Sequence, residues 1–201
     1  MKFDLHMHTS RYSHDSMMDP LHLIARAREI GLDGIVITEH DRLWPEEELV
    51  ELRAIAKGLI VLAGVEITGR GGDMLCYGVN DISMLPRGTP WSELTREVHR
   101  QGGVCVAAHP YRWGQPFDEL VAEADVEIDG VEMLSNNMDA EIRAKTAAFK
   151  LGRPELAGLG NSDAHEVGVV GCCYTEFDAT IRTMPELVQA IRAGKSTPHC
   201  R

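Results

Sequence analysis

Histidines and carboxylates follow several short apolar runs of this chain, and both residue types bind metal ions. Six of the nine histidines stand at or just past the end of such a run, with acids close by. The residues concerned are His6, His8, His14, Asp15, His40, Glu66, His109, Asp163 and His165. Imidazoles and carboxylates gathered from many strand ends are what a multinuclear metal site requires.

The spacing of His6 and His8 predicts that both rings point to one side of a strand, because side chains alternate with a period of two. Asp163 and His165 repeat this spacing later in the chain. A single pair of this kind is weak evidence, since most such pairs bind nothing. Unpaired polar groups at the ends of several buried strands would, however, cost several kcal/mol each. The full set therefore favours metal binding over a purely structural role.

Short apolar runs alternate with amphipathic segments, which predicts a parallel α/β fold, either a barrel or an open sheet. Strands are expected over residues 2–8, 34–38, 60–67, 73–79, 103–108, 130–134, 156–160 and 174–177. Helices are expected over 21–30, 45–58, 89–102, 139–151 and 183–194, with a loop and a short helix between 111 and 124. Asp19-Pro20 and the capping box that begins at Thr183 mark two helix starts.

The length of 201 residues and the lack of a linker predict one domain over 1–201. Neither a G-x-G-x-x-G turn nor a Walker loop is present, which weakens a nucleotide-binding open sheet. In a parallel barrel, active sites lie at the C-terminal ends of the strands, where the histidines and acids stand.

The motifs, taken in order, resemble those of the polymerase and histidinol phosphatase (PHP) family of metal-dependent phosphoesterases. The matching segments are His6-x-His8, Asp15, Ile-Thr-Glu-His40-Asp, Gly-Val-Glu66, His109-Pro and Ser-Asp163-Ala-His165. The likeness runs from residue 4 to about residue 177. It implies a distorted TIM-like (β/α)7 barrel with two or three divalent metal ions at the strand C-terminal ends.

The resemblance also implies three groups of metal ligands. They are His6, His8, Glu66 and Asp163 for the first ion, Glu66 and His109 for the second, and Asp15 (or His14) with His40 and His165 for the third. Many relatives have a histidine where this chain has Asp73, so Asp73 is either a further ligand or the mark of a weaker second site. Mixed nitrogen and oxygen ligands suit Zn²⁺, Mn²⁺ or Fe²⁺.

The expected reaction is hydrolysis of a phosphate ester of a small metabolite or nucleotide, by attack of a metal-bridging hydroxide. Catalytic roles are expected for Glu66, as the bridging ligand, and for His165 or Asp163, in protonating the leaving group. Arg112 and Arg42 are candidates for binding the phosphate, with a solvated surface arginine as the alternative for each.

Residues beside the ligands have expected roles of their own. Glu39 and Asp41 are candidates for orienting metal-bound histidines. Trp44 and the loop 111–116, which contains Trp113, are expected at the mouth of the cleft. For Trp44, packing within its loop is the stronger alternative.

Two other functions remain open from the sequence. Barrel amidohydrolases that cleave carbon–nitrogen bonds also begin with H-x-H, but no metal-bridging lysine stands near mid-chain. A metal-binding regulatory domain without turnover is the third reading, and Asp73 is its best support. A nucleic acid polymer is an unexpected substrate, because the net charge of −11 repels phosphate backbones.

The five cysteines form no C-x-x-C pair, which favours a reduced, cytoplasmic protein. The first residues run directly into an expected strand, so no signal peptide is predicted. No apolar stretch approaches the roughly 18 residues of a membrane span, so we expect no membrane partner. The sequence predicts no oligomeric state.

Overall fold

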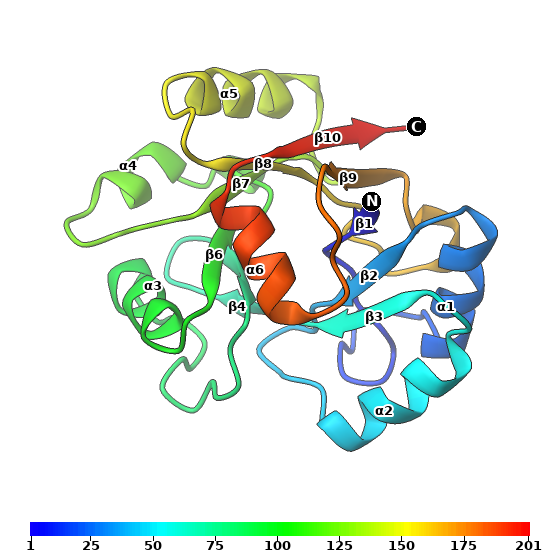
Figure 1. Ribbon diagram of the computed structural model, residues 1–201. Helices are drawn as coiled ribbons and strands as arrows, with labels where there is room; N and C mark the ends of the chain where they lie inside the picture. The colour runs from blue at the N-terminus through cyan, green and yellow to red at the C-terminus, as the bar shows by residue number, and fades with distance from the viewer.

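The computed structural model describes all 201 residues and shows a mixed α/β fold in which helices surround two five-stranded β-sheets (Figure 1). The first sheet has the order β10-β9-β1-β2-β3. Its strands are β1 (Lys2–Asp4), β2 (Gly34–Ile37), β3 (Ile60–Ala63), β9 (Cys173–Phe177) and β10 (Ser196–Cys200). The second sheet follows chain order, with β4 (Val65–Thr68), β5 (Asp73–Tyr77), β6 (Val104–Ala107), β7 (Gly130–Leu134) and β8 (Ala157–Gly160).

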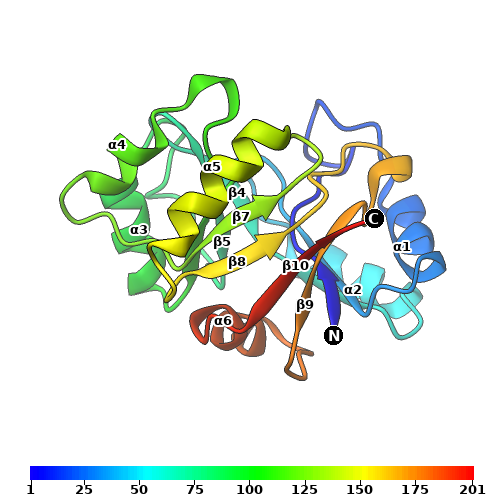
Figure 2. The ribbon, with the colours of Figure 1, turned by 90° about the horizontal axis from the view of Figure 1, so that it is seen from above.

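The helices lie outside the sheets, with α1 and α2 on one side of the molecule and α3, α4 and α5 on the other (Figure 2). They are α1 (Pro20–Glu29), α2 (Glu46–Ile55), α3 (Trp91–Arg100), α4 (Phe117–Ala122), α5 (Ala140–Leu151) and α6 (Met184–Arg192). The expected caps are confirmed: the Asp19 side chain accepts a hydrogen bond from Leu21 N, and Thr183 and Glu186 form a capping box.

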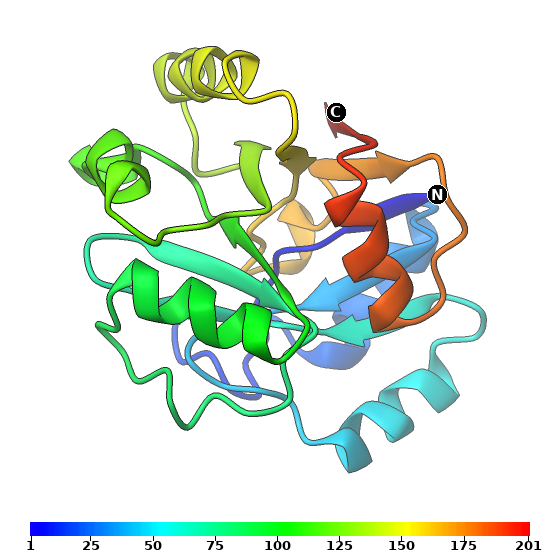
Figure 3. The ribbon, with the colours of Figure 1, turned by 60° about the vertical axis from the view of Figure 1, so that its left-hand side comes forward.

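The main core lies between the two sheets and contains residues from both. Phe3 and Val36 of the first sheet share it with Leu75 and Val106 of the second. Apolar residues of α6, such as Leu187, pack into the same cluster, and Figure 3 shows this helix lying across the strands. Two further clusters fill the spaces between each sheet and its outer helices. The sheets are therefore buried on both faces, which explains their nearly continuous apolar sequences.

The expected seven-unit closed barrel is not shown. β1, β2 and β3 are parallel, as are β6, β7 and β8, but β5 runs antiparallel to both β4 and β6. The single strand expected over 60–67 is two strands in different sheets, separated at Gly64. A Cβ at Gly64 would lie 2.8 Å from the carbonyl oxygen of Cys76, so only glycine allows this close approach.

Between the sheets, pairing is reduced to two isolated parallel bridges. One joins Met7 to Ala164 and the other joins His40 to Glu66. Both lie past or near strand ends, beside the histidines and acids singled out above. Each bridge marks a seam, that is, a place where an edge of one sheet meets an edge of the other. Both seams therefore lie at the expected metal-binding residues.

The cysteines differ from the expectation of a fully reduced chain, because Cys173 and Cys200 form a disulfide between β9 and β10. These residues face each other in the antiparallel register, which the sequence did not predict because β10 itself was not expected. Cys76, Cys105 and Cys172 are free. None of the helices is long and apolar enough to cross a membrane.

This disulfide gives a prediction for stability. It closes a loop with a sequence separation of 27 residues, so Cys200→Ser should lower the free energy of unfolding by roughly 3 kcal/mol under oxidising conditions. Denaturant unfolding measures the loss, and Cys172→Ser is the matched control that should leave stability nearly unchanged. Five reactive thiols in the denatured, unreduced wild type, instead of three, would show that the bond does not form.

Candidate metal centre

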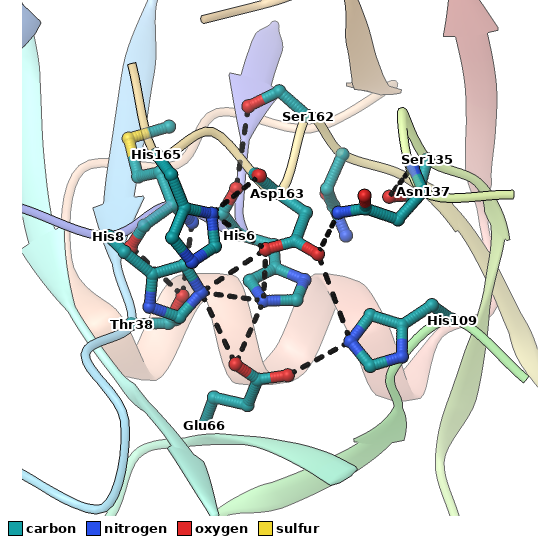
Figure 4. A network of polar contacts seen from close by, with 12 residues as sticks. His6, His8, Thr38, Glu66, His109, Ser135, Asn137, Ser162, Asp163 and His165 are labelled. Carbon is teal, nitrogen blue, oxygen red and sulfur yellow. Dashed lines mark hydrogen bonds and ion pairs between the residues drawn. The ribbon is translucent and has the colours of Figure 1, made fainter. Parts of the chain in front are cut away.

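The histidines and acids of the two seams converge on one buried site at the C-terminal ends of the parallel strands (Figure 4). His6 and His8 follow β1, and Asp163 and His165 follow β8, on either side of the Met7–Ala164 bridge. Backbone hydrogen bonds hold these segments together, from His8 N to Ala164 O at 2.9 Å and from Asp163 N to His6 O at 2.9 Å. The second bridge likewise places His40, after β2, beside Glu66 of β4. The backbone pairing of the sheets therefore fixes the positions of the donors.

Buried acids set the orientation of both inner histidines. His6 Nδ1 lies 2.8 Å from Glu132 Oε1 in the interior, so this nitrogen carries the proton. His8 Nδ1 lies 3.3 Å from the hydroxyl of Ser13, which itself donates to the buried carboxylate of Glu39. The hydroxyl proton is thus used, and His8 Nδ1 is the donor to Ser13. In both neutral rings the Nε2 lone pair is left facing the site.

The first donor set has the arrangement of a cation site. The Nε2 atoms of His6 and His8 are 3.1 Å apart, so in the neutral rings two lone pairs are directed at each other. Each lies 3.2–3.3 Å from Glu66 Oε2 and 3.3 Å from Asp163 Oδ1. Both oxygens are buried, and Asp163 Oδ1 has no hydrogen-bond partner. Four electron-rich atoms around one point are repulsive unless a cation lies among them, so these residues fit a divalent ion.

Glu66 divides its two carboxylate oxygens between neighbouring groups of donors. Oε2 faces the first set, whereas Oε1 lies 3.1 Å from His109 Nε2. A carboxylate in this position can bridge two ions. Asp73 lies within 4.8 Å of the Glu66 and His109 donor atoms, so the aspartate is near the second set. Burial, together with the charge of Glu66, raises the pKa of Asp73.

A third set of donors lies on the more exposed side. Asp15 Oδ2 is 3.1 Å from His40 Nε2 and 3.3 Å from His165 Nε2. His40 Nδ1 lies 2.9 Å from Glu66 Oε2, which connects this set with the first. The neighbouring His14 is exposed and makes none of these contacts. The geometry therefore favours Asp15 over His14 as the donor.

The crowding of these side chains shifts the pKa values of the donors. Burial alone would lower the pKa of His40, but the hydrogen bond to Glu66 and the charges of Glu66 and Asp15 outweigh it and raise the pKa to about 9. The pKa values of His6 and His109 are also raised, because nearby carboxylates outweigh burial. Conversely, burial opposes ionisation of Glu66 and Asp163, but the surrounding histidines lower the pKa of both. The imidazoles therefore hold protons that a metal ion must displace.

The backbone is strained where the donors attach. Asp163 has φ = 51° and His109 has φ = 28°, both in the region that favours glycine. Such conformations cost about 1–3 kcal/mol each and persist only where the surroundings impose them. Here the bond from His109 N to Glu132 Oε2, at 2.8 Å, and the bridge beside Asp163 hold these conformations in place.

A cleft of about 550 Å³ opens above the donors. Arg112 lines it, and its Nη1 lies 3.4 Å from Asp163 Oδ2. Arg42 is not among the lining residues, because its guanidinium packs on the ring of Tyr12 at 4.2 Å; the expectation that it binds phosphate therefore has no geometric support. Arg87 lines the cleft instead.

The aromatic residues expected at the mouth of the cleft behave differently. Trp113 lines the cleft. Trp44 is buried and donates from Nε1 to Glu39 at 2.9 Å, so the packing alternative describes it. Asp41 accepts from Thr68 N and does not contact a histidine, whereas Glu39 does act on His8 through Ser13.

Sequence reasoning missed Glu132, Asn137 and Arg87. Glu132 is fully buried in β7, and the signal was available as a single acid inside the apolar run Gly130–Leu134. Asn137 donates from Nδ2 to Asp163 Oδ2 from the loop after β7. Neither Asn137 nor Arg87 belongs to a recognisable motif, because loop paths that are not visible in the sequence bring them to the cleft.

Comparison with known protein families and structures gives one consistent result. The model of the PHP domain family matches residues 4–146, and that of the PHP-associated family matches residues 142–196. An uncharacterized protein of Methanocaldococcus jannaschii is 29% identical over 149 residues, which cover 67% of this chain and 82% of that protein.

Three solved structures are similar in fold. A two-domain protein of Bacteroides vulgatus, containing a predicted PHP-like metal-dependent phosphoesterase, has a TM-score of 0.78 and 21% identity. PsfC from Pseudomonas syringae has a TM-score of 0.73 and 18% identity, and the lesion-specific endonuclease Q of Pyrococcus furiosus has 0.69 and 20%. These matches cover 100%, 100% and 98% of this chain but 64%, 91% and 57% of the other chains. At these identities the likeness concerns the fold alone.

The orientation of His6 by Glu132 can be tested through metal affinity. Glu132→Gln keeps the shape of the side chain but removes the charge that favours a proton on His6 Nδ1. We expect the affinity for Zn²⁺ to fall by roughly 10- to 100-fold, measured by competition with a chromophoric chelator. Glu123→Gln, at an exposed position, is the matched control. An unchanged Zn²⁺ affinity in Glu132→Gln would contradict the assigned orientation.

The raised histidine pKa values predict how stability depends on pH. Because the folded pKa of His40 is about 9 against an ordinary 6.5, its contribution is complete below about pH 6.5 and is lost as pH rises through 9. The Tm of the chelator-treated protein should therefore fall by about 3 °C or more between pH 6.5 and 9.5. Metal favours neutral imidazoles, so the Zn²⁺-loaded protein should not show this loss. Parallel Tm curves for both forms would contradict this account.

Proposed function

The chain belongs to the PHP domain family, and from this premise we propose that it is a metal-dependent phosphoesterase acting on a phosphate ester of a small metabolite or nucleotide. The observation that carries the proposal is the convergence of four buried atoms on one point, and one of them, Asp163 Oδ1, has no hydrogen-bond partner. The four atoms are His6 Nε2, His8 Nε2, Glu66 Oε2 and Asp163 Oδ1. The similarity to PHP-like metal-dependent phosphoesterases supports a hydrolase.

We assign the metal ligands by the three donor sets. His6, His8, Glu66 and Asp163 hold the first ion, Glu66 and His109 the second, with Asp73 as a further donor, and Asp15, His40 and His165 the third. The second set has the fewest imidazoles, and the third is the most exposed. Both would accordingly bind less tightly than the first. Zn²⁺, Mn²⁺ and Fe²⁺ suit this mixture of nitrogen and oxygen donors.

When bound, divalent ions would neutralise the negative charge of the phosphate oxygens and activate water at neutral pH. The protein's own groups then position the ester. Arg112 reaches the rim beside Asp163 and offers planar, paired donors that match a phosphate. Arg87 approaches from the loop before α3 as a second cation, with its guanidinium 3.5 Å from Asp41.

The two candidates for protonating the leaving group differ in environment. Burial opposes ionisation of Asp163, but the charges of the surrounding histidines, with His6 foremost, lower its pKa, so it stays an anion. It is held in place by Asn137 and by Arg112. His165 lines the cleft and is partly exposed, so a leaving group in the cleft can reach its ring. We therefore assign proton transfer to His165, in the form of the enzyme in which the third donor set (Asp15, His40 and His165) binds no ion.

A small substrate fits the charge of the chain better than a polymer does, because the net charge of −11 opposes binding of a nucleic acid backbone. Endonuclease Q shows that the same fold occurs in a protein that acts on DNA lesions, but that chain is much longer than this one. No lysine lines the cleft, which gives no support to the amidohydrolase alternative. A single functional domain over 1–201 and a cytoplasmic location remain predictions.

Phosphate release tests the proposal. The protein stripped of metal and reloaded with Zn²⁺, Mn²⁺ or Fe²⁺ should hydrolyse at least one member of a panel of phosphomonoesters. Asp163→Asn should lower kcat/KM by at least about 100-fold, with loss of bound metal by elemental analysis. Asp178→Asn, at an exposed position, and Arg42→Ala are controls that should leave activity unchanged.

The other outcomes separate the alternatives. Bound metal with no phosphoester activity under any loading would contradict the proposal and favour a regulatory metal-binding domain. Hydrolysis of amides without hydrolysis of phosphoesters would favour a carbon–nitrogen hydrolase.

A further inference from the structure

One tryptophan of the chain is exposed, and it stands at the metal cleft. Trp44 and Trp91 are buried, whereas Trp113 is 86% exposed and is the sole aromatic among the large exposed hydrophobic residues. Leaving an indole in water forgoes a large hydrophobic gain, so its position at the cleft calls for an explanation.

Arg112 covers one face of this indole, with its guanidinium carbon 3.9 Å from the ring centroid. The same guanidinium reaches Asp163 at 3.4 Å, which ties the aromatic ring to the metal centre. The high exposure of Trp113 means that its second face is open. A planar group could therefore stack on that face while its phosphate lies beside Arg112.

A recess of about 360 Å³ adjoins the metal cleft at this point. It shares Thr68, Asp73 and His109 with the cleft, as well as Arg112 and Trp113 themselves. The turn between β4 and β5, rich in glycine, forms much of its wall. A group attached to a phosphate at the metal centre can thus extend into this recess without leaving the protein surface.

The glycines of this turn expose their backbone to the recess, and Gln115 packs closely against one of them. A Cβ at Gly72 would lie 1.6 Å from the side-chain nitrogen of Gln115, so a larger residue there would displace the Gln115 amide. Gln115 also accepts a hydrogen bond from Tyr111 N at 3.1 Å and thereby holds the loop of Trp113 against the turn. The recess is therefore shaped by contacts within the protein itself.

The loop that carries Trp113 is strained. Tyr111 has φ = 66° and Trp113 has φ = 54°, conformations that bulky residues rarely adopt. The hydroxyl of Tyr111 donates to Asp118 at 2.8 Å, and Gln115 N donates to Arg112 O at 3.0 Å. These bonds keep the tryptophan in its outward position, as is typical of backbone strain at functional sites.

We propose that this recess binds the base of a nucleoside phosphate, stacked on the open face of Trp113, while the phosphate lies at the metal centre beside Arg112. The inference rests on the proposed phosphoesterase function and names its substrate class.

The chemistry of the recess selects a nucleobase over other planar groups. Trp113 is the one hydrophobic side chain among its 11 lining residues. Four of the others are glycines, which present backbone N–H and C=O groups, and Thr68 and Gln115 add polar side chains. A plain aryl ring would leave these groups without partners, whereas a base presents ring nitrogens and exocyclic groups at its edge. The acidic net charge favours a mononucleotide over a strand.

A matched pair of ligands tests the proposal. The methylenephosphonate analogues of AMP and of ribose 5-phosphate resist hydrolysis and differ only in the base. Calorimetry on the Zn²⁺-loaded full chain should show roughly tenfold tighter binding of the AMP analogue, the size expected for one stacked base. Trp113→Ala should remove this difference, so that the two analogues bind with equal affinity, and Trp113→Phe should keep most of it. Leu151→Ala, which removes another exposed hydrophobic side chain, is the control.

Each alternative result has one meaning. Equal affinities for the two ligands, with no effect of Trp113→Ala, would overturn the base subsite but leave the phosphoesterase proposal intact. Failure of both ligands to bind, together with no release of phosphate from any ester, would instead overturn the proposed function. Tighter binding of a single-stranded oligonucleotide than of the AMP analogue would overturn the mononucleotide as the ligand and indicate the end of a nucleic acid strand instead.

Discussion

The structure depends on the crowding of four electron-rich side-chain atoms from His6, His8, Glu66 and Asp163 at a buried point between the two sheets. Such a group is unfavourable in a protein interior unless positive charge compensates it. Protons on the imidazoles provide that charge in the metal-free chain, and divalent ions would provide it in the loaded form. The fold holds the donors rigidly, because isolated backbone bridges across the seams fix their positions.

This constraint explains the supporting residues. Glu132 faces His6 directly, and Glu39 acts on His8 through Ser13, so two buried carboxylates determine which ring nitrogens face the site. The same glutamates also bond to the backbone of nearby loops, at His109 and Thr9. Loop geometry and histidine orientation are thus set by the same groups. The consequence is that the rim of the cleft, including the loop of Trp113, is fixed relative to the donors.

Much of this site could be predicted from the sequence, because His6, His8, Glu66 and Asp163 lie at strand ends and strand ends of an α/β fold meet. The periodicity also located most helices and strands. It did not show that the run 60–67 divides at Gly64, since both halves are apolar and the break depends on a contact with Cys76 in another strand. Glu132 was missed because a buried acid in a strand becomes meaningful only when its partner is known. The disulfide between Cys173 and Cys200 was missed because it requires β10, whose polar sequence gives no strand signal.

The central claim is that these donors hold metal ions, and anomalous X-ray scattering from a crystal soaked in Zn²⁺ tests it most directly. We expect a peak among His6 Nε2, His8 Nε2, Glu66 Oε2 and Asp163 Oδ1, and a second peak on the Glu66 Oε1 and His109 side. Glu132 should remain bonded to His6 Nδ1. A well-ordered site with no anomalous peak among these atoms, or zinc bound only elsewhere on the surface, would contradict the account.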